Sequence, residues 1–259
     1  SKSLSYLSQK TATVVSRLTE AGAVILGYLN LDELAAGGTG DNSHFGRCKN
    51  PWHHGHISGG SSSGSASAIA ACLAIATLGS DAGGSIRVPA AYCGVTGLKP
   101  TYGRVSRFGA MPRTWSMDCI GPITRNAKDC AVVLDVIAGA DTKDATSINS
   151  PKLFLAALSR PFDRIRIGID TNLIAQSDAA IQDVCDDTIH TLKALNAPLY
   201  DIHLPNLDLL NNLQQVIVKA EAATLHGKCL RERPNDLSYA MKAVIQEGFS
   251  LPATTYIEA

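Results

Sequence analysis

Apolar and polar positions follow two periods along the chain, one typical of helices and one typical of strands. Apolar side chains at every third or fourth position predict helices, and residues 127–138 are a clear case. Helices are predicted at residues 13–23, 66–77, 88–92, 127–138, 179–195 and 207–231. Apolar runs bounded by turn residues predict strands at residues 23–29, 95–99, 165–169 and 199–203. Because strands alternate with helices, we expect an α/β fold with a central mixed, largely parallel β-sheet covered by helices on both faces.

The charge balance argues against two classes of partner. The 259 residues include 23 Lys and Arg against 23 Asp and Glu, so the formal net charge is zero. Because nucleic acids and anionic membrane surfaces recruit a basic excess, we expect no nucleic acid and no membrane as a partner. The longest apolar run, residues 66–78, is too short to span a bilayer. The chain therefore reads as a soluble globular protein.

Cysteine and histidine usage points to a reduced interior without a metal. The seven cysteines are odd in number and show no CxxC or Cys/His ligand spacing, which indicates buried thiols in a cytoplasmic protein rather than a disulfide framework. His53, His54 and His56 are close together, but no cysteine or acidic residue flanks them as a further ligand. We therefore expect no metal and no cofactor.

Two clusters rich in glycine and serine carry the densest chemical signal. Residues 58–67 run directly into a helix of small residues, so their backbone N–H groups lie at a helix N-terminus, which suits an anion. Residues 79–87 contain two adjacent glycines, which allow consecutive amides to point into one concavity, as an oxyanion hole requires. Asp81 and Arg87 flank this turn with opposite charges. We favour a turn-stabilising ion pair for these two residues over a direct part in chemistry.

The two clusters, together with the sequence between residues 89 and 104, resemble the amidase signature family. The matching stretches include Gly-Gly-Ser-Ser-Ser-Gly-Ser at 59–65, Gly-Ser-Asp-Ala-Gly-Gly-Ser-Ile-Arg at 79–87 and Gly-Leu-Lys-Pro at 97–100. The resemblance is strong from about residue 12 to 147 and continues more weakly to the end of the chain. It implies the amidase-signature fold and an enzyme that hydrolyses or transfers carboxamide groups with a Ser–Ser–Lys triad.

The resemblance also implies roles for individual residues. Ser85 takes the position of the nucleophile, and Ser61 takes that of the bridging serine, whose peptide bond is cis in this family. Ser62 takes the position of a supporting hydrogen-bonding residue. The oxyanion hole is assigned to the backbone amides of Ala82, Gly83, Gly84 and Ser85. Because a serine hydroxyl is a weak nucleophile, such a site needs a base that accepts its proton.

The base of the triad is expected outside the numbered chain. In the family the catalytic lysine lies in a motif upstream of the residues that resemble 1–4, so neither Lys2 nor Lys10 takes its position. Lys99 belongs to the Gly-Leu-Lys-Pro stretch and is interpreted as structural. We therefore expect a single amidase-signature domain over residues 1–259 that is incomplete at both ends.

The sequence leaves three functions open. The leading one is an amidase that cleaves the C–N bond of a small linear carboxamide to a carboxylate and ammonia or an amine, and the resemblance suggests a homodimer. The second is the A subunit of a glutamine-dependent aminoacyl-tRNA amidotransferase, and the third is a non-catalytic protein on the same fold. Cys119 stands where the amidotransferase usually has glutamine, which favours the hydrolase.

Overall fold

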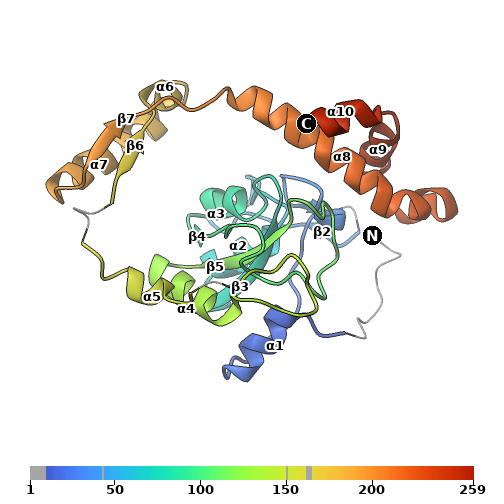
Figure 1. Ribbon diagram of the computed structural model, residues 1–259, viewed down its shortest axis with the longest axis horizontal. Coiled ribbons are helices and arrows are strands. Elements are labelled where there is room, and N and C mark those ends of the chain that lie inside the picture. The colour runs from blue at the N-terminus through green and yellow to red at the C-terminus, as the bar shows by residue number, and fades with distance from the viewer. Residues whose placement is uncertain (1–9, 43, 150, 162–164) are drawn as a thin grey trace. The chain divides into compact units, whose positions relative to one another are not determined.

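The predicted helices and strands form in large part in the structure, a computed structural model that describes residues 10–42, 44–149, 151–161 and 165–259 (Figure 1). Contacts between residues divide the chain into two units. The first comprises the described residues up to Leu155 together with Gln214–Ala259, and the second is Ala156–Leu213. The expectation that the whole chain makes a single domain stays a prediction.

The first unit contains a three-stranded sheet in the order β3 (Ala76–Asp81), β5 (Cys119–Thr124) and β4 (Thr96–Gly97). β5 is buried at all six positions and pairs antiparallel with both neighbours. The expectation of largely parallel strands is therefore wrong for this sheet. The physical reason is the connection from β4 to β5, an irregular loop over residues 98–118 that lacks the crossover helix typical of a parallel pair.

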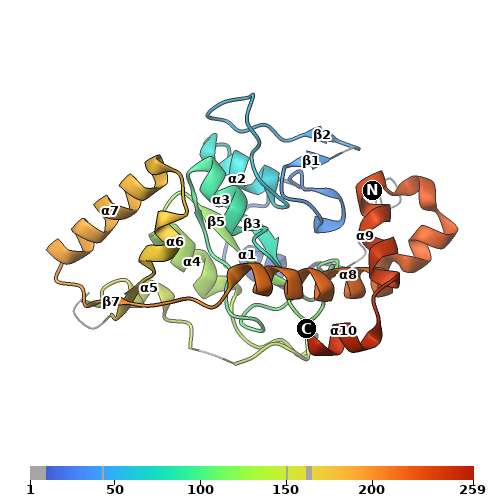
Figure 2. The same cartoon turned by 90° about the horizontal axis from the view of Figure 1, so that it is seen from above.

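Helices cover both faces of this sheet, as the sequence predicts (Figures 1 and 2). Ile120 and Ile123 lie three positions apart on β5, so their side chains point to opposite faces. Ile120 packs in a cluster with Val14 and Leu134, and Ile123 packs in a second cluster with Ile69. The α/β class is therefore confirmed. The covering helices are α1 (Thr13–Glu20) and α4 (Ala127–Ile137) on the first face, and α2 (Ser63–Ala70) and α3 (Arg87–Cys93) on the second.

Two local expectations differ from the structure. Residues 66–77 are predicted as one helix, but α2 ends and β3 begins within this range, on either side of Cys72, whose φ of 58° is left-handed. Residues 23–29 are predicted as a buried strand, yet they are irregular, and Val24 is 83% and Tyr28 97% exposed. A short apolar run indicates strand character without specifying a partner strand, and no strand pairs with this segment among the described residues.

The C-terminal helices belong to the first unit from Gln214 onward. They are α8 (Leu207–Glu232), α9 (Tyr239–Phe249) and α10 (Ala253–Glu258). Ser238 caps α9, because its hydroxyl accepts the N–H of Met241, while its own N–H donates to the Glu33 carboxylate. Short elements complete this part of the chain, namely η2 (Glu33–Ala35), β1 (Asp41–Asn42), β2 (Gly46–Arg47), α5 (Phe154–Ala157) and η4 (Pro234–Asp236).

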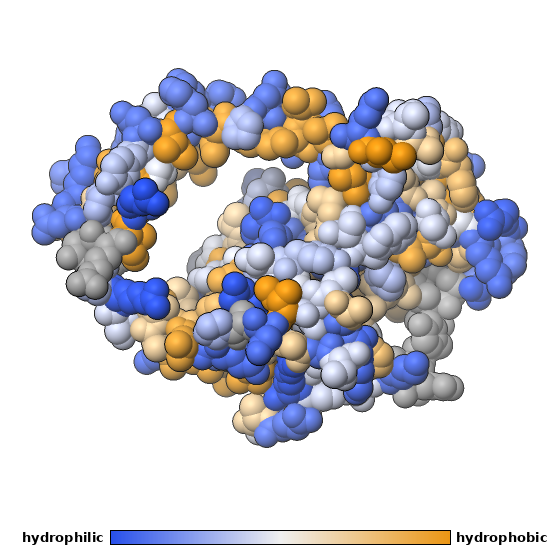
Figure 3. Space-filling model, viewed as in Figure 1, coloured by the Kyte–Doolittle hydropathy of each residue, from blue (hydrophilic) through white to orange (hydrophobic). Residues whose placement is uncertain are grey.

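The second unit is a small parallel pair of strands with crossover helices. Its elements are β6 (Ile167–Ile169), α6 (Thr171–Ala175), α7 (Ala179–Ala194) and β7 (Leu199–Asp201). The strands expected at 165–169 and 199–203 and the helix expected at 179–195 are confirmed with shorter bounds. Apolar side chains of α7 such as Ile181 and Val184 are exposed, and hydrophobic surface is visible along this unit in Figure 3. Across the described residues, no helix combines the length and apolar character needed to cross a membrane.

The close approach of α9 to α8 generates a first testable prediction. A Cβ at Gly248 would lie 2.1 Å from the carbonyl oxygen of Lys219, whereas a Cβ at Gly227 would meet the end of the Phe249 side chain, which can move. Because the backbone must shift, we expect Gly248→Ala to lower the free energy of unfolding by about 1–3 kcal/mol. Gly227→Ala is the matched control, since both glycines lie inside helices and both variants gain helix propensity. Denaturant unfolding that shows equal losses for the two variants would contradict this packing.

Candidate active site

The carboxylate of Asp81 organises the turn that follows β3. This side chain is buried, and its Oδ1 accepts the N–H of Gly84 at 2.7 Å while its Oδ2 accepts the N–H of Ile86 at 3.1 Å. The Arg87 guanidinium donates to both carboxylate oxygens at 3.0 Å, so the expected ion pair is present. Burial acts to raise the pKa of Asp81, but the Arg87 bonds and the two amides outweigh it and hold the pKa below its ordinary value.

Ser85 lies at the end of this turn, directly before α3. Its side chain is nearly buried, with 7% of the residue exposed. Its carbonyl oxygen accepts the N–H of Ser62 at 3.1 Å, and this bond joins the turn to the first glycine–serine cluster. The Ser62 hydroxyl accepts the N–H of Ser80 at 3.2 Å and lies 3.3 Å from the Ser80 carbonyl oxygen, so Ser62 fastens the cluster to β3. Two segments that lie about twenty residues apart in the sequence are therefore held side by side.

Ser61 directly precedes Ser62 in the first glycine–serine cluster. The Gly60–Ser61 peptide bond is cis, as the resemblance implies. The residue is 1% exposed, its carbonyl oxygen accepts the N–H of Asp32 at 3.0 Å, and its hydroxyl has no hydrogen-bond partner among the described residues. A buried hydroxyl without a partner is unusual in a folded protein, because leaving it unpaired costs free energy.

A cavity of about 350 Å³ lies beside the turn, at the small end of the range for ligand pockets. The two clusters contribute Gly60, Gly83, Gly84 and Ser85 to its wall. Its other lining residues are Ala36, Gly37, Gly38, Val88, Arg113, Gln214, Gln215, Ala240, Met241 and Val244. No local pattern could have found those from α8 and α9, because they lie more than a hundred positions along the chain from Ser85.

The structure refines the expected oxyanion hole. The N–H of Gly84 already donates to Asp81, so it serves the turn and is not directed at the cavity. The two glycines differ in how strictly their positions exclude a side chain: at Gly83 the end of the flexible Gln214 side chain would have to move, whereas at Gly84 the backbone itself disfavours a side chain. A Cβ at Gly83 would lie 2.4 Å from the amide nitrogen of the Gln214 side chain, and Gly84 has a φ of 126°, which side chains rarely tolerate. The amides of Ala82, Gly83 and Ser85 remain for the proposed oxyanion hole.

Asp32 is a buried carboxyl group to which the sequence analysis gives no role. Its side chain fills the space between two glycines, because a Cβ at Gly37 or at Gly60 would lie only 2.4 or 2.1 Å from its Oδ2. Oδ2 accepts the N–H of Gly40 at 3.3 Å, while Oδ1 is buried without a partner among the described residues. Burial outweighs the bond from Gly40 and raises the pKa of Asp32 to about 6. Asp32 and Glu33 are adjacent acidic residues in the sequence, and this pattern alone does not assign a role to either.

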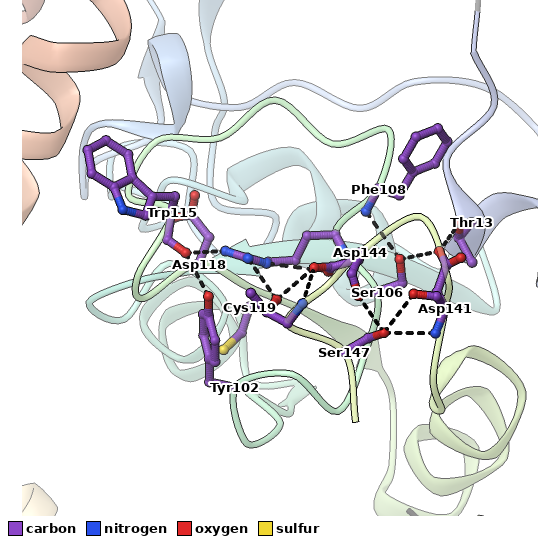
Figure 4. Close-up of polar contacts among 12 residues, drawn as sticks. Thr13, Tyr102, Ser106, Phe108, Trp115, Asp118, Cys119, Asp141, Asp144 and Ser147 are labelled. Carbon is purple, nitrogen blue, oxygen red and sulfur yellow. Dashed lines mark hydrogen bonds and ion pairs between the residues drawn. The ribbon is translucent and has the colours of Figure 1, made fainter. Parts of the chain in front are cut away.

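Polar contacts fix the loop between β4 and β5, which carries further cavity residues (Figure 4). Asp141 accepts the hydroxyls of Thr13 at 2.5 Å and Ser106 at 2.6 Å. Asp144 accepts the N–H of Arg107 at 2.8 Å, and the Arg107 side chain donates to the carbonyl oxygen of Trp115. The loop is therefore tied to the rest of the first unit at Ser106 and Arg107, and the bond from Arg107 to Trp115 braces it internally.

The thiols and histidines add no second candidate site. Cys93, Cys119 and Cys130 are buried and form no disulfide among the described residues. Burial raises the pKa of each thiol, which favours the neutral form expected of cysteines in a core. Within the described ranges, no group of three His, Cys, Asp or Glu side chains could hold a metal ion.

The raised pKa of Asp32 predicts a pH-dependent contribution to stability. Because its folded-state pKa of about 6 exceeds the ordinary 3.8, protonation favours the folded chain, and this stability is complete below pH 3.8 and lost as the pH rises through 6. In Asp32→Asn the group no longer titrates. Between pH 4 and 7.5 the free energy of unfolding of Asp32→Asn should therefore rise relative to the natural chain by about 2–3 kcal/mol.

Asp32→Ala is the control for this experiment, because it also removes the titrating group but loses the bond from Gly40. When urea unfolding is measured at several pH values, the free energy of unfolding of both variants should rise with pH by the same amount relative to that of the natural chain. Parallel pH profiles for the natural chain and Asp32→Asn would show that Asp32 is not protonated by folding.

The chain is similar to amidotransferases and amidases over most of its length. The A subunit of glutamyl-tRNA(Gln) amidotransferase from Pseudomonas aeruginosa is 48% identical over 221 residues, which cover 85% of this chain and 46% of that protein. A solved structure described as an inhibitor-bound vestigial complex that reveals the origins of an s-triazine catabolic enzyme gives a TM-score of 0.90 at 35% identity, over 98% of this chain and 55% of that one. A crystal structure of an amidase gives a TM-score of 0.82 at 32% identity, over 95% and 54% of the two chains.

The chain spans about half the length of these relatives. The family model described as Amidase matches residues 1–259, the whole of the numbered chain. The matched region includes both glycine–serine clusters, the turn at Ser85 and the cavity beside it. The chain therefore belongs to the amidase family, the amidase signature enzymes.

Proposed function

We propose that this chain carries the nucleophile of an amidase that hydrolyses a carboxamide to a carboxylate and ammonia or an amine. The observation that supports this most directly is the position of Ser85. It lines a ligand-sized cavity on a turn of glycines, and the segment that contains Ser61 is hydrogen-bonded to its carbonyl oxygen. A nucleophilic hydroxyl, a second buried hydroxyl and free backbone amides are the groups that acyl transfer requires.

The proposed reaction proceeds through an acyl-enzyme. The Ser85 hydroxyl attacks the amide carbonyl carbon, and its proton passes to Ser61 and from there to the base. The negative oxygen of the tetrahedral intermediate is held by the amides of Ala82, Gly83 and Ser85. When the C–N bond breaks, the amine leaves with a proton returned through Ser61. Water then attacks the ester carbon of acyl-Ser85 and releases the carboxylate.

The base in this proposal is a lysine, as the family resemblance implies. No lysine lines the 350 Å³ cavity among the described residues, and the lysine is expected upstream of residue 1. The unpartnered hydroxyl of Ser61 is consistent with this assignment, because a base must contact that oxygen to relay the proton.

A second candidate is the A subunit of a glutamine-dependent amidotransferase. The 48% identity to the A subunit of glutamyl-tRNA(Gln) amidotransferase favours it. Cys119, which favours the hydrolase in the sequence analysis, lines neither of the two cavities found in the described part of the chain. Cys119 lies opposite Asp81 in the sheet and outside both cavity walls. Its identity therefore distinguishes the two candidates only weakly. Glutamine hydrolysis that depends on partner proteins and on charged tRNA would select the amidotransferase.

The nucleophile is tested by Ser85→Ala in the complete natural protein, with ammonia release from a panel of carboxamides that includes glutamine as the measurement. Loss of the attacking atom should lower kcat about 10⁴–10⁶-fold without a change in melting temperature. Ser67→Ala is the control, because the Ser67 hydroxyl donates to the backbone carbonyl oxygen of Lys49 and lies outside the cavity wall. Undiminished turnover in Ser85→Ala would exclude the mechanism. A natural protein that releases no ammonia and transfers none to tRNA would support the non-catalytic alternative.

The bridging serine makes a separate prediction. Ser61→Ala should lower kcat about 10²–10⁴-fold while KM changes little, because it removes a proton relay and not a binding contact. Ser63→Ala is the matched control, a buried serine two positions away whose hydroxyl contacts the Asn30 carbonyl oxygen at 3.5 Å. Equal losses in the two variants would indicate that Ser61 supports the structure alone.

A further inference from the structure

The cavity beside Ser85 contains one charged side chain. Among its described lining residues, Arg113 is the only ionisable group other than the serine itself, and the remaining polar side chains are the amides of Gln214 and Gln215. Arg113 also lines a second cavity of about 280 Å³, beside Trp115 and Asp118. The space next to the proposed nucleophile therefore carries a positive charge and no side-chain carboxylate in its described wall.

The Arg113 guanidinium is poorly paired for its degree of burial. One of its terminal nitrogens donates to the carbonyl oxygen of Ala35 at 3.0 Å, while its Nε is buried without a hydrogen-bond partner among the described residues. Burial lowers the pKa of the guanidinium, and Asp118 opposes this only in part. A guanidinium remains charged in proteins, so the lost hydration has to be replaced by a partner of opposite charge.

Asp118 compensates this charge only in part. One of its carboxylate oxygens accepts the backbone N–H groups of Arg113 at 2.8 Å and Thr114 at 2.9 Å, and within the described residues no direct ion pair joins Asp118 to the guanidinium, although the two charges attract each other. His226 donates to the Pro112 carbonyl oxygen, and burial followed by the charge of Arg113 favours its neutral form by lowering its pKa.

The loop that carries Arg113 is held in place from two sides. Figure 4 shows the bond from the Ser106 hydroxyl to Asp141, and the N–H of Arg107 donates to Asp144, so the first part of the loop is fastened. On the other side, Glu221 of α8 accepts the N–H of Ser116 at 3.1 Å and the hydroxyl of Tyr256 at 3.0 Å. A charged group fixed in this way binds a ligand without a further ordering cost.

We propose that Arg113 binds a carboxylate of the substrate, so that the cavity accepts a small amide that also carries a carboxylate group. This inference rests on the proposed function, because it places the amide carbonyl of the same substrate at Ser85. An arginine–carboxylate pair is charge-assisted and can form two parallel hydrogen bonds. A substrate with a cationic group would be repelled, and a neutral amide of the same shape would leave the charge unpaired.

Binding to the Ser85→Ala protein tests the inference without depending on turnover. The probes are malonamate, succinamate and glutaramate, each compared by calorimetry with its neutral diamide. At least one of the three carboxylates should bind about 10–100-fold more tightly than its diamide. Arg113→Gln, placed on the Ser85→Ala background, should abolish that ratio, because glutamine can still donate to Ala35 but carries no charge.

Matched variants separate the charge from the fold. Arg125→Met should preserve the ratio, since Arg125 is an exposed arginine outside both cavities, and Arg113→Lys should retain part of it. If Arg113→Gln does not fold, as judged by its melting curve, Arg113→Lys decides, because loss of the two-point contact should still reduce the ratio. The proposal is wrong if no carboxylate of the three is preferred, or if the preference survives in Arg113→Gln. Turnover that persists in Ser85→Ala would overturn the proposed hydrolase and leave the binding result standing.

Discussion

The site depends on one buried carboxylate, that of Asp81. At the end of β3 the backbone leaves the sheet and must turn sharply to begin α3, and its amides lose their partners in the ladder. Asp81 accepts the amides of Gly84, Ile86 and Arg87 and pairs with the Arg87 guanidinium across the turn. Removing Arg87 would leave the buried Asp81 carboxylate without its charged partner, which is far more costly than losing a surface ion pair. The position of Ser85 in the cavity wall therefore follows from electrostatics inside the turn rather than from packing of the serine itself.

Close backbone approach is the second constraint. The two glycine–serine clusters come within hydrogen-bonding distance only because side chains are absent at the positions where they meet. Gly79 is an example, since a Cβ there would lie 2.7 Å from the Ser62 hydroxyl. Asp32 likewise lies where a Cβ at Gly37 or Gly60 would be. These positions therefore require glycine because a Cβ would collide with neighbouring atoms, and not because the backbone has to be flexible there.

These constraints explain which features the sequence could predict. The turn at Asp81 and its ion pair with Arg87 follow from local residue types, and they are present. The prediction of buried thiols holds for Cys93, Cys119 and Cys130, whereas Cys72 is exposed and the other three cysteines are partly exposed. The strand β5 was not predicted, because Pro122 interrupts an otherwise apolar run and a proline in a central strand argues against one. Neither the exposure of residues 23–29 nor the antiparallel pairing of β5 can be read from hydrophobic periods, because a period defines a buried face but not its neighbour. Asp32, Gln214 and Arg113 reach the site only through tertiary contacts.

The arginines of the first unit can be sorted by how completely their donors are used. Arg87 is paired with both oxygens of Asp81, and Arg17 donates to the carbonyl oxygens of Ile137, Gly139 and Ala140. Each of these guanidinium groups offsets its desolvation within the chain, so its role is structural. Among the described residues Arg113 has a single side-chain hydrogen bond, to Ala35, and it lies in the wall of the cavity that contains the proposed nucleophile. Arg113 therefore differs from Arg87 and Arg17 in how few of its donors the protein itself uses, and the proposed anionic ligand would supply a partner.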